Sequence, residues 1–293
     1  FIFPSADLYQ SAAIGYDYGP HGAQLKQNVI SRWWRDFVTR RRDVVALDSC
    51  VLAPEAVWAG SGHLKNFVDP LTECNSCRKR FRADHLVEAA SGDSDAGSDL
   101  QLLGAAIEHL GRTCPACGAV GAEGLGGKLH RPMQSWDTHK TVECLFTDPR
   151  RFNMLFETSV GAVDGGSAQA FLRPETAQGV YTQWRNIHTT TRNKLPIGVA
   201  SIGRSFRNEI STSNYIFRTR EFEQAELQFF CLPEESAEYQ QQWTQRCLDW
   251  LIQLGVDRSR LRLREHKGTE LAHYALATTD IEYEYPFGWG ELW

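Results

Sequence analysis

Two segments of the sequence place ionic and aromatic residues at alternate positions, as on one face of a β-strand. The first segment contains Arg207 and Glu209. The second carries the longer series Arg220, Phe222, Gln224, Glu226 and Gln228. Because strand side chains alternate between two faces, a hairpin of the two segments would gather a guanidinium, a ring and carboxylates on one surface. This is unlike a core strand and indicates a surface that carries chemistry; an exposed face of salt bridges is the alternative.

A second group of chemically capable residues consists of two Cys-x-x-Cys pairs, Cys74 with Cys77 and Cys114 with Cys117. Four thiolates are the ligand set of a closed, structural zinc site, with no position left open for catalysis. Residues 78–113 separate the pairs, and this gap of 36 residues is longer than the usual spacing of about 15–20. Unliganded thiols and disulfides are the alternatives, and His130 and His139 are spare ligand candidates. The remaining cysteines are expected as small buried residues: Cys50, Cys144, Cys231 and Cys247.

A third segment, residues 173–179, combines charge with a fixed turn in the order Arg-Pro-Glu-Thr-Ala-Gln-Gly. Pro174 restricts the backbone, and a helix could begin between Thr176 and Tyr181, with Glu175 near its positive end. This segment suits a structural role as well as a functional one and cannot carry a function by itself.

The elements that must position these residues form an α+β pattern. Residues 1–70 contain a helix predicted from Leu25 to Val38 and a strand from Val44 to Leu52, which Pro54 ends. Residues 71–150 are rich in Cys, Gly and charge and are predicted to be an insertion. Residues 151–293 resume the core with four elements: strands Ile197–Glu209 and Arg220–Phe230, a helix at 236–254 closed by Gly255, and a strand Ala275–Tyr285.

Length and composition fit a soluble globular protein with one large domain or two smaller ones. The chain has 293 residues, 42% of them hydrophobic and 23% charged, and a net charge of −5. No apolar run approaches the roughly 18 residues of a membrane span, and no signal peptide is visible. The mildly acidic balance argues against a protein that coats DNA. Because the chain opens at Phe1 and closes at Trp293, we expect a fragment of a longer protein.

The alternating segments resemble motif 2 of the class II aminoacyl-tRNA synthetases, whose pattern is Phe-Arg-x-Glu, a loop, and Arg-x-x-x-Phe-x-x-x-Glu. The matching positions are Phe206, Arg207, Glu209, Arg218, Phe222 and Glu226. Residues 173–179 and 217–226, with 272–275 and 287–289, narrow the resemblance to glycyl-tRNA synthetases of the homodimeric type. The similarity runs from Tyr16 to Glu291 and is weakest between residues 87 and 145.

The resemblance implies an antiparallel sheet of six to seven strands flanked by helices, with a zinc-ribbon-like insertion. Residues 25–54 would be motif 1, which forms the dimer interface. The implied reaction joins glycine to ATP as glycyl-adenylate and then transfers the glycyl group to tRNA, with Mg²⁺ on the phosphates. Motif 3 and the anticodon-binding domain would follow Trp293. A cytoplasmic homodimer without membrane association is expected.

The resemblance also assigns roles to individual residues. Arg207 would be catalytic, bridging the α-phosphate and the glycine carboxylate, a task that suits a planar guanidinium. The other ATP contacts would be Asn208, Glu209, Phe217, Arg218, Thr219, Arg220, Glu221, Phe222, Glu291 and Leu292, with Glu291 also a Mg²⁺ ligand. The glycine contacts would be Arg82, Glu175, Phe222, Glu223, Gln224, Ala225 and Glu226. Without the resemblance, Arg82 would be interpreted as a surface residue.

Glycine has no side chain to grip, so selectivity must come from its ammonium group and from exclusion of larger amino acids. The resemblance places Glu175 and Glu226 around the ammonium, and their mutual repulsion should raise the pKa of at least one. The sequence departs from the family pattern at Ser211–Asn214, where Ser-Pro-Arg-Asn is common, and at Gln228, where Glu is common. Two alternatives remain: a synthetase-like paralogue that binds RNA or a partner without charging tRNA, and a synthetase for serine or alanine.

Overall fold

The computed structural model describes residues 1–9, 15–91, 99–110, 113–120, 145–162, 168–266, 271 and 274–293. The chain folds as two compact units. The first comprises Phe1–Asn193 with Gly198–Gln228, and the second comprises Lys194–Ile197 with Phe229–Trp293. His130, His139 and Cys144 lie outside the described residues.

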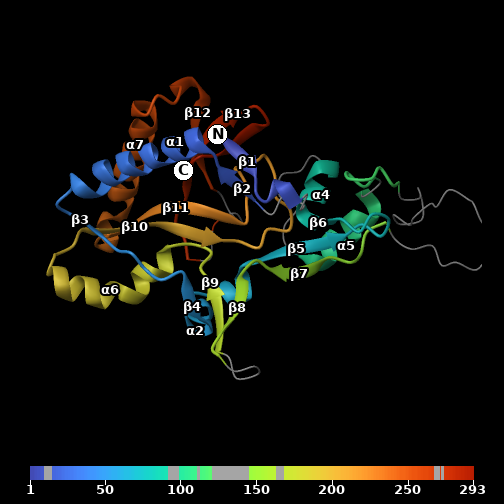
Figure 1. Ribbon diagram of the computed structural model, residues 1–293, viewed down its shortest axis with the longest axis horizontal. Helices are drawn as coiled ribbons and strands as arrows, with labels where there is room; N and C mark the ends of the chain where they lie inside the picture. Colours follow the sequence, from blue (N-terminus) through green and yellow to red (C-terminus); the bar gives the residue numbers. More distant parts are fainter. Residues whose placement is uncertain are drawn as a thin grey trace, which may run out of the picture. The chain divides into compact units, whose positions relative to one another are not determined.

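The central strands of the first unit form a group in the order β11-β10-β3 (Figure 1). They are β10 (Ile197–Phe206), β11 (Glu221–Phe230) and β3 (Val44–Ala46). The predicted hairpin is confirmed, with β10 ending three residues before Glu209. Ile197, Val199 and Ala200 are fully buried, so the first half of β10 anchors the group, and its second half carries the polar face. The β3 strand runs parallel to β10, although an antiparallel arrangement was expected.

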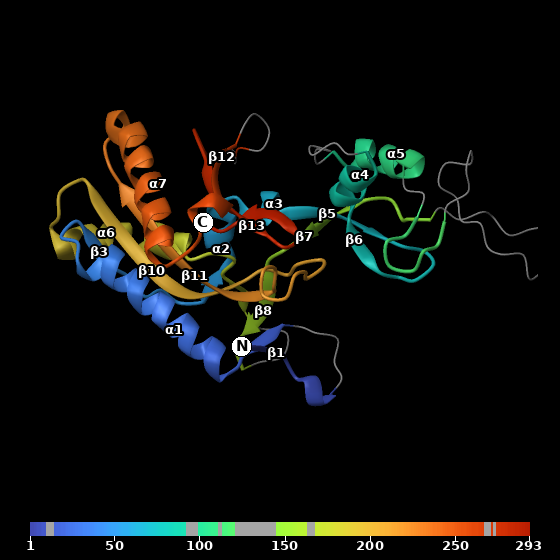
Figure 2. The same ribbon diagram turned by 90° about the horizontal axis from the view of Figure 1, so that it is seen from above.

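Two helices flank this group. Helix α1 (Pro20–Trp34) continues into a π-helical turn, η2 (Arg35–Thr39), and helix α6 covers Ala177–Thr191. Figures 1 and 2 show them on opposite sides of the β10–β11 pair. The helix predicted from Leu25 is confirmed and begins five residues earlier, at Pro20, because proline is favoured in the first turn, where its missing N–H costs nothing.

The prediction of a single strand from Val44 to Leu52 is wrong. The segment forms β3 and a separate strand β4 (Leu52–Pro54), which pairs antiparallel with β9 (Ala168–Leu172). Strand β8 (Phe156–Val160) completes this second group. Helices α2 (Glu55–Gly60) and α3 (His63–Asn66) follow β4, and Trp58, Leu155 and Phe171 form the buried cluster beneath them.

The region predicted as an insertion is entered and left on neighbouring strands. Strand β5 (Val68–Glu73) lies between β6 (Arg80–Arg82) and β7 (Arg150–Asn153), and Leu71 pairs with both Arg82 and Arg150. Helices α4 (Ala83–Ser91) and α5 (Leu100–Leu110) pack on a small core of their own, which includes Val87, Leu103, Ile107 and Phe146. This topology suits an insertion; the boundaries at 71 and 150 stay a prediction.

The second unit pairs helix α7 (Ser236–Gln253) with three antiparallel strands, β12 (Leu261–Glu265), β13 (Thr279–Tyr285) and β14 (Gly288–Glu291). The predicted helix at 236–254 is confirmed, and Gly255 follows it with φ of +97°. Short elements complete the fold: β1 (Ile2–Pro4), η1 (Asp7–Tyr9), β2 (Tyr16–Tyr18), η3 (Pro233–Glu235) and η4 (Arg258–Arg260).

The expected six- to seven-stranded sheet is divided: the described strands hydrogen-bond in five small groups. Of the cysteines predicted to be buried, Cys247 is buried and Cys231 is partly so, whereas Cys50 is exposed, because it lies in the connection between β3 and β4 rather than in a continuous strand. No helix among the described residues is long and apolar enough to cross a bilayer.

Candidate active site and candidate metal centre

Arg207 lies directly after β10 on the predicted polar face. Its backbone N–H donates to the Arg220 carbonyl at 2.9 Å, which fixes the register of the hairpin. Its guanidinium lies 5.3 Å from the centre of the Phe222 ring and 5.7 Å from that of Phe67, and its Nε donates to the Pro174 carbonyl at 3.2 Å. The sequence-based expectation that Arg207 and Phe222 share a surface is therefore confirmed.

Glu226, farther along the same face, is half-buried and held by one neighbour. The Thr176 backbone N–H donates to Glu226 Oε2 at 2.8 Å, and the Thr176 hydroxyl donates to the same oxygen. Burial raises the pKa of the Glu226 carboxyl, and the nearby Glu175 carboxylate adds to the rise; the Thr176 hydrogen bonds and Arg207 oppose it without cancelling it. Glu226 is thus a carboxylate kept in place by hydrogen bonds in surroundings that disfavour its charge.

The pKa of Glu175 is shifted in the opposite direction from that of Glu226. Gln178 Nε2 donates to Glu175 Oε1 at 2.7 Å, and His63 Nε2 lies 3.5 Å from the same oxygen. Burial alone would raise the pKa of Glu175, but the contacts with His63 and Gln178 and the charges of His63 and Arg207 bring it below its ordinary value. The expectation that one carboxyl of the pair has a raised pKa is met at Glu226.

Arg173 anchors the turn that carries Glu175 and Thr176. Its side chain is buried; Nε donates to the Arg204 carbonyl at 2.8 Å and Nη1 to the Ser49 carbonyl at 2.9 Å. The guanidinium lies against Gly203, where any Cβ would strike it. No specific role could be predicted for Arg173 and Thr176, because their partners are distant in sequence and only the turn itself could be predicted.

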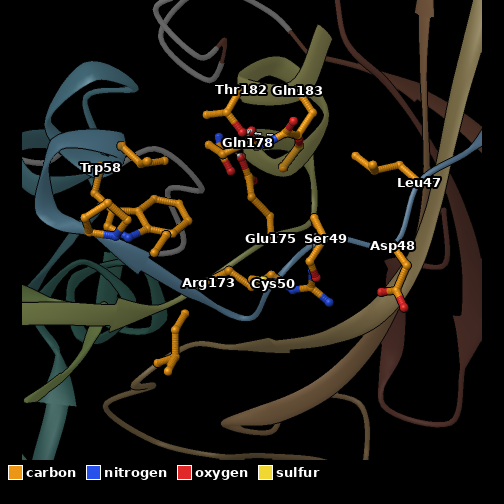
Figure 3. A pocket seen from close by; sticks show the side chains of 15 residues that line it. Leu47, Asp48, Ser49, Cys50, Trp58, Arg173, Glu175, Gln178, Thr182 and Gln183 are labelled. Carbon is orange, nitrogen blue, oxygen red and sulfur yellow. Dashed lines mark hydrogen bonds between the residues drawn. The ribbon is translucent and has the colours of Figure 1, made fainter. Parts of the chain in front are cut away.

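A cavity of about 530 Å³ opens beside this turn (Figure 3). Trp58 and Ser49 contribute to its lining, and Figure 3 shows the Glu175 carboxylate directed at Gln178. Gln178 Oε1 and, on β11, Gln224 Oε1 are buried and find no hydrogen-bond partner among the described residues. Buried acceptors without partners are costly, so these two near the carboxylates suit a ligand that brings N–H donors.

Arg82 lies in a second ionic group. Its Nη1 is 3.1 Å from an Asp69 carboxylate oxygen, and its Nη2 is 2.6 Å from Asp84 Oδ2. Glu209 and Arg218 are close enough to influence the pKa of Asp69, which is raised chiefly by burial. The structure thus brings Arg82 of β6 and Asp69 of β5 to the same neighbourhood as Glu209 and Arg218 of the hairpin.

Other residues predicted to contact ligands are engaged elsewhere. Glu223 forms an ion pair with Lys26 at 2.5 Å, and Glu221 pairs with Arg204. These two side chains and exposed Ala225 alternate with the half-buried residues of β11, so they do not join the face that carries Phe222 and Glu226. Their predicted ligand contacts could be made only through backbone atoms.

The remaining predicted ATP contacts lie in and around the hairpin loop or in the second unit. Asn208 donates through its backbone to the Met154 carbonyl at 2.8 Å, Arg220 Nε donates to the Glu209 carbonyl at 3.0 Å, and the buried Thr219 hydroxyl donates to the Glu221 carbonyl at 2.8 Å. Phe217 is 37% exposed beside Arg218. Glu291 and Leu292 belong to the second unit, where Leu292 donates to the Ile281 carbonyl at 2.9 Å.

The four paired cysteines meet as predicted. Their sulfur atoms all lie within 4.8 Å of one another. The Cys74–Cys117 and Cys77–Cys114 sulfur separations are 4.0 and 3.8 Å, far above the roughly 2.0 Å of a disulfide. They are close to the edge of about 3.8 Å of a tetrahedron whose metal–sulfur bonds are about 2.3 Å. The cluster can therefore hold a metal ion, and disulfides do not fit.

Each pair forms a tight backbone turn. Arg78 and Gly118, directly after the second cysteine of each pair, have φ of +61° and +69°. Their N–H groups donate to the carbonyls of Cys74 and Cys114 at 2.8 and 2.9 Å. These turns direct both thiols of a pair to one side, so the ligand set depends mainly on local geometry.

Comparisons with known proteins show what the chain is similar to. The tRNA synthetase class II core domain (G, H, P, S and T) matches residues 156–286. The glycine–tRNA ligase of Caldanaerobacter subterraneus subsp. tengcongensis is 43% identical over 300 residues, covering 100% of this chain and 59% of the relative. The glycine–tRNA ligase of Thermobifida fusca is 45% identical over 296 residues, covering 99% and 57%.

Among solved structures, the RNA binding domain of threonyl-tRNA synthetase from Cryptosporidium parvum Iowa II shares the fold. The TM-score is 0.51 with 14% sequence identity, and the match covers 94% of this chain and 54% of that one. The chain spans less than two thirds of the length of its curated relatives. Residues 156–286 thus match the class II tRNA synthetase core domain, and the whole chain is similar to 57–59% of the length of these glycine–tRNA ligases.

Proposed function

We propose that the protein containing this chain ligates glycine to its tRNA through a glycyl-adenylate formed from glycine and ATP. The observation that carries this proposal is the half-buried group of Glu175, Glu226 and Arg207 around one turn. Two carboxylates and a guanidinium in one half-buried site match the ammonium and carboxylate of an amino acid.

The ammonium group would lie between the carboxylates. Only one of the two Glu226 carboxylate oxygens accepts hydrogen bonds from Thr176, so the second could accept from the ammonium. The buried side-chain carbonyl oxygens of Gln178 and Gln224 have no hydrogen-bond partner among the described residues and could also accept from it. An ammonium has three donors and a charge that relieves the repulsion between Glu175 and Glu226. Selectivity against alanine would require the space around the ammonium to be too narrow for an added methyl group, which would then be excluded by overlap.

Arg207 would stabilise the attack on ATP. Adenylation brings the glycine carboxylate toward the α-phosphate, so catalysis depends on positioning and on neutralising charge. The guanidinium is held by the Pro174 carbonyl and lies over Phe222, and its planar fork can contact both anions at once. Phe222 would stack on the adenine, Glu209 would accept from the adenine amino group, and Arg218 would hold the γ-phosphate.

Metal ions complete the proposal. A zinc ion would be held by the four cysteines as a structural centre. A Mg²⁺ ion, with Glu291 as a ligand, would neutralise phosphate charge. We also propose a cytoplasmic homodimer formed through residues 25–54, where the exposed Leu25 and Val29 of α1 offer apolar surface, with tRNA as the acceptor substrate.

The test is amino-acid-dependent exchange between ATP and pyrophosphate in the full-length protein, with glycine, alanine and serine compared. Exchange with glycine alone is expected. Exchange with alanine or serine instead would favour a synthetase for another small amino acid. No exchange with any of the three would favour a paralogue that binds RNA or a partner without charging it.

A further inference from the structure

We infer that Thr176 is a positioning residue for the substrate amine: it holds one oxygen of the Glu226 carboxylate and leaves the other directed at the ligand. The inference rests on the proposed function, in which Glu226 receives the ammonium. It assigns a role to a residue whose own side chain would not contact the substrate.

The first observation is that both Thr176 donors converge on a single atom. The backbone N–H reaches Glu226 Oε2 at 2.8 Å, and the hydroxyl donates to the same oxygen. An ionised carboxylate only accepts hydrogen bonds, so the direction of both bonds is fixed. Two donors at one oxygen fix the rotation of the carboxylate. In the part of the chain that the structure describes, both of these hydrogen bonds to Oε2 come from Thr176, and Oε1 remains for a ligand.

The second observation is that Thr176 cannot move independently of its turn. Its side chain is fully buried. Two positions earlier, Pro174 accepts the hydrogen bond from Arg207, and Arg173 ties the start of the turn to Ser49 and Arg204. One rigid turn thereby sets the position of the cationic group for the substrate carboxylate and of the anionic group for its amine. Such fixed geometry is what makes a binding site selective.

The third observation concerns charge. The charged groups that face Glu226 are Glu175, Arg207 and Arg173. Burial and Glu175 favour the protonated form of Glu226, whereas the Thr176 donors and Arg207 favour the ionised form. Loss of the Thr176 hydroxyl should therefore raise the pKa of Glu226 further, so that binding of the amine is lost at a higher pH than in the parent protein.

The experiment measures glycine-dependent pyrophosphate exchange in the full-length protein carrying Thr176→Val, which has nearly the same shape without the hydroxyl. We expect KM for glycine to rise about tenfold, the effect of one hydrogen bond to a charged group, while KM for ATP changes less than about twofold. The acid limb of kcat/KM for glycine should move to higher pH. Thr176→Ser should restore both values, and Thr189→Val, which removes an exposed hydroxyl from α6, should change neither.

A double substitution separates action through Glu226 from a general effect. If Thr176 acts through that carboxylate, Thr176→Val should add little to the loss of glycine binding caused by Glu226→Gln. If Thr176→Val does not fold, Thr176→Cys replaces it, because a thiol is only a weak donor. This variant should also raise KM for glycine more than KM for ATP, but by a smaller factor.

Three results would overturn the inference. The first is an unchanged KM for glycine and an unmoved acid limb while the melting temperature falls, which would mean a purely structural role. The second is full additivity of Thr176→Val and Glu226→Gln. The third is a parent protein that shows no exchange with glycine; that result refutes the proposed function as well, whereas the first two arise with the parent protein active.

Discussion

The cysteine cluster and the carboxylate site, each proposed to receive a cation, are built in different ways. The four cysteines come from two short turns, each closed by two backbone hydrogen bonds and backed by the small core around Leu103. The carboxylate site needs α3, the turn before α6, the end of β10 and the middle of β11. The first is a local structure; the second exists only when the hairpin and the turn are in register.

The two regions also differ in how completely they enclose a cation. Four thiolates at tetrahedral spacing leave no ligand position open, which suits an ion that stays bound. Glu226 uses one oxygen for Thr176 and leaves the other open, while Glu175 is already stabilised by Gln178 and His63. The negative charge of the two carboxylates is thus only partly compensated by the protein. Such a site suits a cation that binds and leaves repeatedly, as the substrate amine would in the proposed reaction.

The largest expected effect tests the local character of the metal centre. Cys114→Ser should reduce bound zinc from about one ion per chain to nearly none, because structural zinc contributes on the order of 10 kcal/mol to small metal-dependent folds. Hydrogen exchange should show lost protection in β6, α4 and α5 but not in α7. Elemental analysis and exchange mass spectrometry measure this, with Cys50→Ser as the control because Cys50 is exposed and outside the cluster. Unchanged zinc content would contradict the assignment.

Next in size is the effect of removing the guanidinium from the other region. Arg207→Ala should lower the adenylation rate about 10²- to 10³-fold, the usual cost of losing one preorganised transition-state donor. Arg207→Lys should be intermediate, because it keeps the charge but not the fork. Zinc content should be unchanged in both variants. Pyrophosphate exchange measures the rate, and near-normal kinetics in Arg207→Ala would remove its catalytic role.

A smaller effect should distinguish the two carboxylates in the free protein. The folded-state pKa of Glu175 is lowered, so its stabilising contribution is present above its unfolded pKa and is lost as the pH falls through the folded value. The pKa of Glu226 is raised, so its ionisation opposes folding at neutral pH and this penalty disappears in acid. At pH 7, Glu175→Gln should destabilise and Glu226→Gln should stabilise, each on the order of 1 kcal/mol.

Denaturant unfolding at pH 7 and at about pH 4 measures these differences. Both should shrink at the lower pH, where the ordinary carboxyl group begins to protonate. If both variants changed the free energy of unfolding in the same direction at pH 7, the opposite pKa shifts inferred for Glu175 and Glu226 would be contradicted.

The smallest effect is expected on the exposed face of the same hairpin. Arg204 and Glu221 form an ion pair whose side chains are 61% and 50% exposed, and exposed pairs contribute about 0.2–1 kcal/mol at most. Arg204→Ala with Glu221→Ala should therefore leave stability within that range and both KM values unchanged. A large rise in KM for ATP would show that the Glu221 side chain itself serves the site.

Sequence patterns could predict whatever depends on near neighbours. Alternation along residues 220–228 predicted which side chains of β11 share a face, and the cysteine spacing predicted the metal ligands. The contacts of Thr176 with Glu226 and of Arg173 with Ser49 could not be predicted, because they join residues 50 and 124 positions apart. The strand expected at Val44–Leu52 failed for a related reason: its apolar residues serve two different sheet groups, which periodicity alone cannot separate.

The close approach of Arg173 to Gly203 has a consequence for anyone who surveys this protein by saturation mutagenesis. A methyl group at position 203 would displace the guanidinium from its hydrogen bonds to Ser49 and Arg204 and so disturb the turn that carries Thr176. Even Gly203→Ala should therefore score as severely as a change in a ligand-binding residue, although glycine at that position has no side chain to offer a substrate. A tolerance map of the protein would mark Gly203 as functional when what it provides is empty space.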